Sequence, residues 1–330
     1  GHLVGVFTLD RHGTGYKSTK AFNLLASNDE WTAPIMAEVG PDGQVWVIDW
    51  YNFIVQHNPT PKGFTTGKGM AHETKLRDKK RGRIDRVVYG DQQPAAFSLF
   101  GATPEELVAA LSHPTMLWRK HAQRLLVERG NDDVAAQLIT LVKDPGVDQV
   151  GLNVGAIHAI WTLHGLGQLD GRNDRATKAV AAALAHQSAG VRRNAVQALP
   201  PTESSTRALL NAELWHDRDP QVRLAALLGL SDLPAVADAG AALFSLLSST
   251  DAADDPQLID AAVSAAAKNS GAFLRAVVES GKRPPAETLE VVEIVARHAG
   301  SRISPDNAAA LFTTLSNASD DKVVSAVITG

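Results

Sequence analysis

With 330 residues and a formal net charge of −4, the chain is long enough for sizeable cores and lacks the basic field that would favour nucleic acid. It contains no cysteine, which excludes disulfides, thiolate metal sites and a covalently attached c-type haem within these residues. No run of about 18 apolar residues is present, so we predict no transmembrane segment here.

The beginning of the chain predicts short antiparallel strands. Residues 3–9 form an apolar, β-branched run, and a glycine-containing loop at 10–15 precedes its return strand. Two further runs, 36–39 and 44–50, flank the sequence Gly-Pro-Asp-Gly at 40–43, which favours a tight turn. About four strands of this length are the content of one propeller blade, and a single sheet of this size needs neighbours to cover it.

Aromatic, acidic and basic residues are densest between Pro34 and Tyr89. The last part of the segment from Pro34 to Tyr89, residues 83–89 (RIDRVVY), predicts a strand that closes the β segment. Residues 57–80 contain several prolines and glycines and show little periodicity, which predicts a long loop. Loops of this length are usually functional or held against another surface. Because the chain after residue 100 is typical of helices, we expect any site chemistry to lie in the segment from Pro34 to Tyr89, unless the helices only bind partners.

After residue 90 the sequence becomes typical of helices. We predict a β-propeller segment at 1–90, a linker at 91–102 and an all-α, HEAT-like solenoid at 103–330. Thr103-Pro104-Glu105-Glu106 has the composition of a helix N-terminus. A repeated unit, seen most clearly as Arg-x-x-Ala, places alanines about 31 to 37 residues apart, the period of two-helix repeats. The aligned alanines are Ala122, Ala159, Ala195, Ala226 and Ala262.

Polar and aromatic side chains at the end of the 44–50 run are candidates for the rim of a substrate or cofactor site. A carboxylate at a strand end could ligate calcium or position a sugar hydroxyl, or it could cap the turn that follows. Trp46 and Trp50 share one face of a strand, which is compatible with stacking on a sugar or with burial between sheets. The rim candidates are Asp49, Trp50, Asn52, His57 and Asp78.

The long loop carries two further sets of candidate residues. His57, His72 and Glu73 are metal-competent, but no tight spacing such as H-x-x-x-H links them, so the pattern gives a metal site little support. Ion pairs and backbone hydrogen bonds from arginines are expected to hold the loop on the β core. These predicted loop pins are Arg77, Arg81 and Arg83.

Three arginines recur with the helical repeat, at Arg119, Arg192 and Arg223. We predict that they form a ladder with carboxylates of adjacent repeats. An interaction groove is the alternative, because solenoids present a concave surface.

The runs GHLVGVFTL, GPDGQVWVIDWYN, TGKGMAHETKLRDKKRGRIDRVVY and ATPEELVAALSHPTMLWRKHAQRLLVERG closely resemble the large membrane-bound dehydrogenase-like proteins of planctomycetes and verrucomicrobia. The resemblance covers residues 1–130 by motif and the remainder by its repeat architecture. It implies a sorbosone- or glucose-dehydrogenase-type β-propeller, then HEAT repeats, then a c-type cytochrome domain.

The same resemblance implies oxidation of a sugar or polyol at the cell envelope or in the periplasm. It implies pyrroloquinoline quinone, calcium or c-type haem in the parent protein, and as partners the rest of the propeller, a cytochrome domain and a carbohydrate. His72 and Asp85 stand where such proteins have tyrosine, no C-x-x-C-H is present, and the strands suffice only for the last blade.

We therefore expect a fragment of a longer protein that lacks the catalytic base and has little or no activity of its own, so its catalytic residues stay unassigned. Its solenoid would act as a scaffold or docking surface. A non-catalytic carbohydrate- or protein-binding module is the alternative, and a metal-dependent hydrolase is a third and weaker one.

Overall fold

The computed structural model describes residues 2–53, 80–91, 96–171, 173–249, 255–281, 283–301 and 320–330, with single positions between 309 and 318. The chain divides into two compact units, each described by itself. The β unit comprises Gly1–His12 and Tyr16–Ala122, and the helical unit comprises Gly13–Gly15 and Gln123–Gly330. Antiparallel β structure thus precedes an α-helical array, as the sequence predicted.

The predicted strands are present, but they belong to two sheets instead of one four-stranded blade. β1 (Leu3–His12) pairs with β2 (Gly15–Ala26), and β3 (Pro34–Val39), β4 (Val45–Asp49) and β5 (Arg83–Val87) form a second, antiparallel sheet in that order. The loop between β2 and β3 is held by the Ser27 and Asp29 side chains, which accept hydrogen bonds from the backbone N–H groups of Asp29 and Trp31. Because β5 occupies the far edge of β4, the central strand has no edge left for β1 or β2.

The predicted tight turn joins β3 to β4. The backbone N–H of Gly40 donates to the carbonyl of Gln44 (2.8 Å), and Gly43 has a φ of 77°, which favours glycine. Trp46 lies directly against Gly40, where a Cβ atom would overlap the indole ring. The indole Nε1 donates to Asp42 Oδ1 (2.8 Å), and this bond, despite partial desolvation, helps to keep the pKa of Asp42 below its ordinary value. The Arg86 guanidinium pairs with the same carboxylate.

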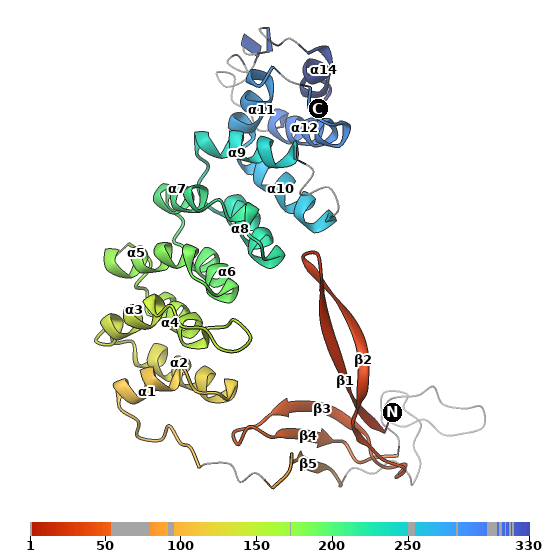
Figure 1. Ribbon diagram of the computed structural model, residues 1–330, viewed down its shortest axis with the longest axis vertical. Helices are drawn as coiled ribbons and strands as arrows, with labels where there is room; N and C mark the ends of the chain where they lie inside the picture. Colours follow the sequence, from red (N-terminus) through yellow and green to blue (C-terminus); the bar gives the residue numbers. More distant parts are fainter. Residues whose placement is uncertain are drawn as a thin grey trace, which may run out of the picture. The chain divides into compact units, whose positions relative to one another are not determined.

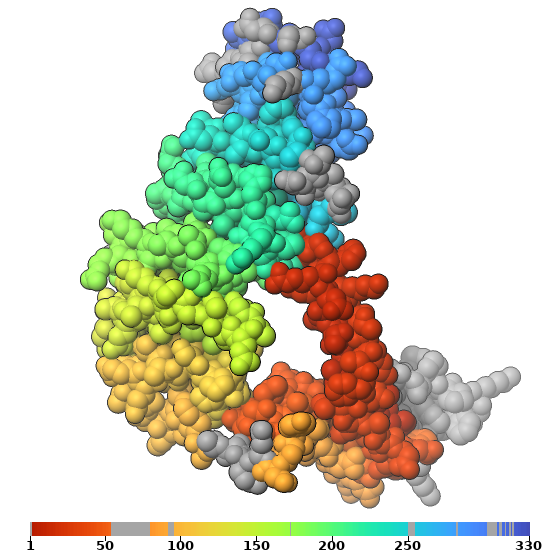
Figure 2. Space-filling model, viewed as in Figure 1, coloured from red at the N-terminus to blue at the C-terminus, as the bar shows by residue number. Residues whose placement is uncertain are grey.

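The helices form two layers, which Figure 1 shows as two stacks of ribbons. In one stack α4, α6, α8, α10 and α12 pack successively. In the other stack α3, α5, α7, α9 and α11 do so. The repeats follow one another in chain order, as the colours of Figure 2 show for the helical unit.

The helix bounds are α1 Pro104–Ala110, α2 Met116–Arg129, α3 Ala135–Lys143, α4 Val154–Gly165, α5 Asp174–Ala182, α6 Ala189–Ala198, α7 Glu203–Ala212, α8 Pro220–Asp232, α9 Ala237–Leu247, α10 Pro256–Lys268, α11 Ser270–Glu279, α12 Ala286–Gly300 and α14 Asp321–Thr329, with short 3₁₀ turns η2 Ala183–Ala185 and η3 Leu214–His216.

Small buried side chains allow the helices to approach closely. The five alanines that define the predicted repeat are all 0% exposed, which confirms their place between helices. Leucines such as Leu126, Leu163 and Leu230 fill the layers around them. The helix starts are capped as expected: Thr103 and Glu106 form a reciprocal capping box on α1. Asn153, Thr202 and Asp219 cap α4, α7 and α8.

Gly240 marks a close approach of two helix backbones in the helical unit. It lies in α9 at the contact with α11, and a Cβ atom there would overlap the backbone of Ala272. We expect Gly240→Ala to lower the free energy of unfolding by about 2 kcal/mol, because neither backbone can move without repacking the layer. Urea unfolding followed by circular dichroism measures this. Gly271→Ala, on α11 with open space around its Cβ position, is the control and should be neutral or slightly stabilising. Equal effects of the two substitutions would contradict the close approach.

None of the helices in the described part of the chain combines the length and the apolar character needed to cross a bilayer.

Candidate functional site

Asp49, the last residue of β4, is the centre of the candidate site. Its side chain is 1% exposed. Oδ1 accepts hydrogen bonds from the backbone N–H groups of Ala33 (2.7 Å) and Tyr51 (2.8 Å), and Oδ2 accepts from Nε (3.1 Å) and Nη2 (2.7 Å) of Arg83. A carboxylate offers about four acceptor positions. The four bonds therefore fill the capacity of Asp49, and a ligand would have to displace one of them.

Arg83 joins this carboxylate to the neighbouring loop. Its Nη2 also donates to the Thr32 hydroxyl (2.9 Å), and its guanidinium lies over the Tyr51 ring at 4.0 Å from the centroid. Burial raises the pKa of Asp49, but the bonds from Ala33, Arg83 and Tyr51 more than offset this, so that the pKa is lowered. The bond to Asp49 in turn raises the pKa of Arg83. The pair is thus a fixed ion pair and not a proton donor or acceptor at neutral pH.

An aromatic cluster borders the ion pair. The Trp31 ring lies 6.1 Å from the Tyr51 ring and 6.5 Å from the Phe53 ring, and the Arg81 guanidinium lies 5.7 Å from the Trp31 centroid. Tyr51 has a φ of 43°, which turns the chain away from the strand direction directly after β4. Phe53 is the exposed ring of these three, and an exposed aromatic face suits stacking on an apolar face of a ligand.

The structure places the candidate residues unequally around this cluster. Trp50 is 48% exposed and Asn52 is buried at 3%. Trp46 is 36% exposed on the turn side of the sheet, at the other end of β4 from Asp49. The remaining sequence candidates lie outside the described residues: His57, His72, Glu73, Arg77 and Asp78.

The described residues do not fit a calcium ion at Asp49. Calcium takes six to eight oxygen ligands, whereas both oxygens of this carboxylate already accept two protein donors each. Within the described ranges, no group of three or more histidine, aspartate or glutamate side chains is placed to hold a metal ion.

Thr32 and Trp31 are site residues that the sequence did not reveal. They lie in the loop before β3, and their contacts to Arg83 and Arg81 cross about fifty residues of chain. The chain itself offers one weak signal, the Ser27, Asp29 and Thr32 pattern of short polar residues that hold a loop by local hydrogen bonds.

The recurring arginines share a position but not a partner. Arg192 forms a bidentate pair with Asp217 of the next repeat (both 2.7 Å), as predicted for the ladder, and also donates to the carbonyls of His186 and Gln187. Arg119 donates to two carbonyls in the corresponding preceding turn, and burial lowers its pKa. For Arg223 no carboxylate partner is found in the part of the chain that the structure describes. The ladder is therefore confirmed at Arg192 alone.

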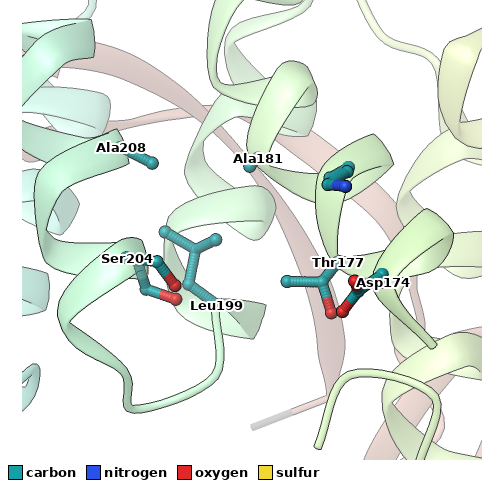
Figure 3. Close-up of a pocket in the computed structure, with 8 residues that line it drawn as sticks. Asp174, Thr177, Ala181, Leu199, Ser204 and Ala208 are labelled. Carbon is teal, nitrogen blue, oxygen red and sulfur yellow. The ribbon is translucent and has the colours of Figure 1, made fainter. Parts of the chain in front are cut away.

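A cavity of about 280 Å³ lies between α5 and α7. Figure 3 shows Asp174 and Thr177 on one side of it and Leu199 and Ser204 on the other. Thr177 Oγ1 is buried there, and no hydrogen-bond partner for it is found among the described residues. Ser204 and Ser205 bond Thr202, and among the described residues no hydrogen bond joins a hydroxyl group of this lining to the side chain of Asp174 or Lys178, so we assign no site to the cavity.

A larger cavity, of about 590 Å³, lies beside α1 and is lined by residues 97–102 and one side of the helix. The Phe97 ring contacts the rings of His113 (4.4 Å) and Trp118 (5.1 Å) at its border. Ser98, Ser112 and His113 contribute polar side chains to the lining, and Glu106 is held in the capping box.

Residues 1–91 match a protein family described as a domain of unknown function, DUF7133. This match covers all five strands, including both partners of the Asp49–Arg83 pair. A search of the curated proteins finds no match. A crystal structure of an engineered protein from the Northeast Structural Genomics Consortium is 17% identical, covering 68% of this chain and 96% of that chain with a TM-score of 0.26.

Proposed function

We propose that this chain is a non-catalytic scaffold, in which the helical unit serves as a spacer or docking surface and the β unit anchors it to further β structure. The observation that supports this is the saturation of Asp49. Its four hydrogen bonds leave the best-placed acidic group of the candidate site without a free acceptor position.

The exposed face of the β1–β2 hairpin supports further β structure as the neighbour. A Cβ atom on Gly5 would lie 3.2 Å from Phe7 and 3.8 Å from Lys20, so these residues share one face. By strand alternation this face also carries Leu9 and Phe22, which are 65% and 57% exposed, and Phe7 is 56% exposed. A two-stranded hairpin with such a face is marginal in water and is stabilised when another sheet covers it.

The parent protein that we propose is a sugar or polyol dehydrogenase-like protein of the cell envelope. The support is the resemblance of residues 1–130 and the order of the two units, β structure followed by helical repeats. In that setting the remaining propeller blades would supply the cofactor and the catalytic groups, and pyrroloquinoline quinone, calcium or haem would be held there.

Carbohydrate binding is the second candidate function. Two observations favour it: Phe53 of the aromatic cluster at the end of β4 is 40% exposed, and Trp50, its neighbour in sequence, is 48% exposed. Tryptophan faces stack well on the apolar faces of sugars. A metal-dependent hydrolase would have to use His57, His72 and Glu73, which lie outside the described residues.

Calorimetric titration separates these functions. We expect no heat of binding with calcium or pyrroloquinoline quinone, and no dye-linked sugar oxidation by the chain. If glucose or a polyol binds, Trp50→Ala should weaken the affinity at least tenfold by removing the stacking face. Tyr89→Ala, which removes another aromatic side chain of the β unit that is 85% exposed, should leave it unchanged. Quinone-dependent turnover by the chain would overturn the scaffold proposal.

A further inference from the structure

One face of the β3–β4–β5 sheet is open and apolar. Along β4 the side chains alternate, so that Val47 is 0% exposed on the covered face while Ile48 is 43% exposed on the other. The pairing places Met36 and Ile84 directly beside Ile48 on the neighbouring strands, and these two side chains are 46% and 68% exposed. The result is an exposed apolar row across all three strands.

A charged row runs parallel to this apolar row on the same face. Glu38, Trp46 and Arg86 are paired directly across the three strands. The Arg86 guanidinium lies 5.9 Å from the Trp46 centroid and bonds Asp42. Glu38 is exposed and takes part in no ion pair among the residues that the structure describes. An unpaired acid therefore lies on one edge strand and a base on the other, with an indole between them.

We infer that this face, defined by Met36, Glu38, Trp46, Ile48, Ile84 and Arg86, binds a second copy of this chain in a two-fold symmetric, face-to-face sheet contact. A two-fold axis that runs in the interface along β4 places β3 of one copy opposite β5 of the other. Glu38 then meets Arg86 of the second copy, twice per dimer, and Met36 meets Ile84 of the second copy.

Charge complementarity is what favours a second copy over an unrelated partner. The same two-fold operation places Trp46 and Ile48 on the axis, each against its own counterpart, while the edge strands bring the Glu38–Arg86 and Met36–Ile84 contacts on either side. A three-stranded face is small, on the order of 250 Å² from strand spacing and rise, against about 800 Å² per partner in a standard interface. The expected dimer is therefore weak and transient.

Analytical ultracentrifugation of the full chain tests this. We expect the weight-average mass to rise from that of the monomer towards that of the dimer as the concentration increases from about 1 to about 200 µM, because a small interface gives a weak dimer that depends on concentration. Glu38→Arg or Arg86→Glu alone should weaken self-association at least tenfold, because each places like charges opposite one another. Mixing the two variants should restore a dimer, since the arginines of one chain then face the glutamates of the other.

A second pair of variants keeps the inference open to refutation if Arg86→Glu disturbs folding through its contact with Asp42. Ile48→Lys should abolish the dimer, whereas Phe7→Lys, on the hairpin, should not. Circular dichroism verifies the fold of each variant. A chain that stays monomeric throughout, a dimer lost with Phe7→Lys but not with Ile48→Lys, or assembly that continues beyond two copies would each overturn the inference.

Discussion

Replacing Arg192 by alanine is expected to lower the free energy of unfolding of the helical unit by about 3–5 kcal/mol. The Arg192 and Asp217 side chains are only 8% and 7% exposed, and the substitution leaves the carboxylate buried without its bidentate partner. It also removes donors from the carbonyls of His186 and Gln187, which close the turn before α6. Urea unfolding followed by far-ultraviolet circular dichroism gives the change.

The adjacent Arg193 supplies a matched control, because it lies on the same helix and is exposed. Arg193→Ala should change the free energy of unfolding by less than about 0.5 kcal/mol. The double variant Arg192→Met with Asp217→Leu should lose less stability than Arg192→Ala, since it leaves no unpaired buried charge. Equal losses for Arg192→Ala and Arg193→Ala would contradict the role assigned to the ion pair.

Asp49→Asn is expected to destabilise the β unit by about 2–4 kcal/mol. The amide retains the shape of the side chain but presents an NH₂ group to N–H donors that now bond a carboxylate oxygen. The Arg83 side chain is 40% exposed, so water can replace part of the hydrogen bonding that its guanidinium loses with the carboxylate. Hydrogen exchange at the amides of β4 and of Tyr51 should be faster in the variant, by the factor that the loss in free energy of unfolding gives.

The effect of Asp49→Asn should depend on pH. The folded-state pKa of Asp49 lies below its ordinary value of 3.8, so the charged form stabilises the fold. The wild type then exceeds the variant in free energy of unfolding by the full amount above about pH 4. This difference falls as the pH drops through the folded-state pKa of Asp49. Asp10→Asn, on an exposed part of β1, is the control and should not show the loss of stability. An advantage that persists unchanged at low pH would contradict this account.

Several features of the fold could be predicted because they depend on neighbouring residues. Gly40 and Asp42 specify the β3–β4 turn through their own backbone and side-chain bonds, whatever the rest of the chain does. Thr103 and Glu106 cap α1 within one turn of helix. The alanine period likewise predicted the helical repeats, because a small side chain is needed at every close contact of paired helices.

The candidate site depended on the tertiary structure. Asp49 was found from the sequence as an acidic residue at a strand end, but its partner Arg83 lies 34 residues further along the chain. They meet because β5 pairs with β4 in a register that sets Arg83 opposite Asp49. The same pairing, together with the separation of β1–β2 into its own sheet, leaves the Met36–Ile48–Ile84 row open.

The sequence by itself thus determined the order of β structure and helices, the turn, the caps and the repeat period, all set by residues within one turn or one repeat. The structure decided which strands share a sheet, which face of a strand stays open and whether a repeated arginine reaches a carboxylate. Arg119, Arg192 and Arg223 share one motif, yet among the described residues only Arg192 of the three pairs with a carboxylate, that of Asp217. The physical reason is that a side chain finds its partner across a contact whose register the motif does not contain.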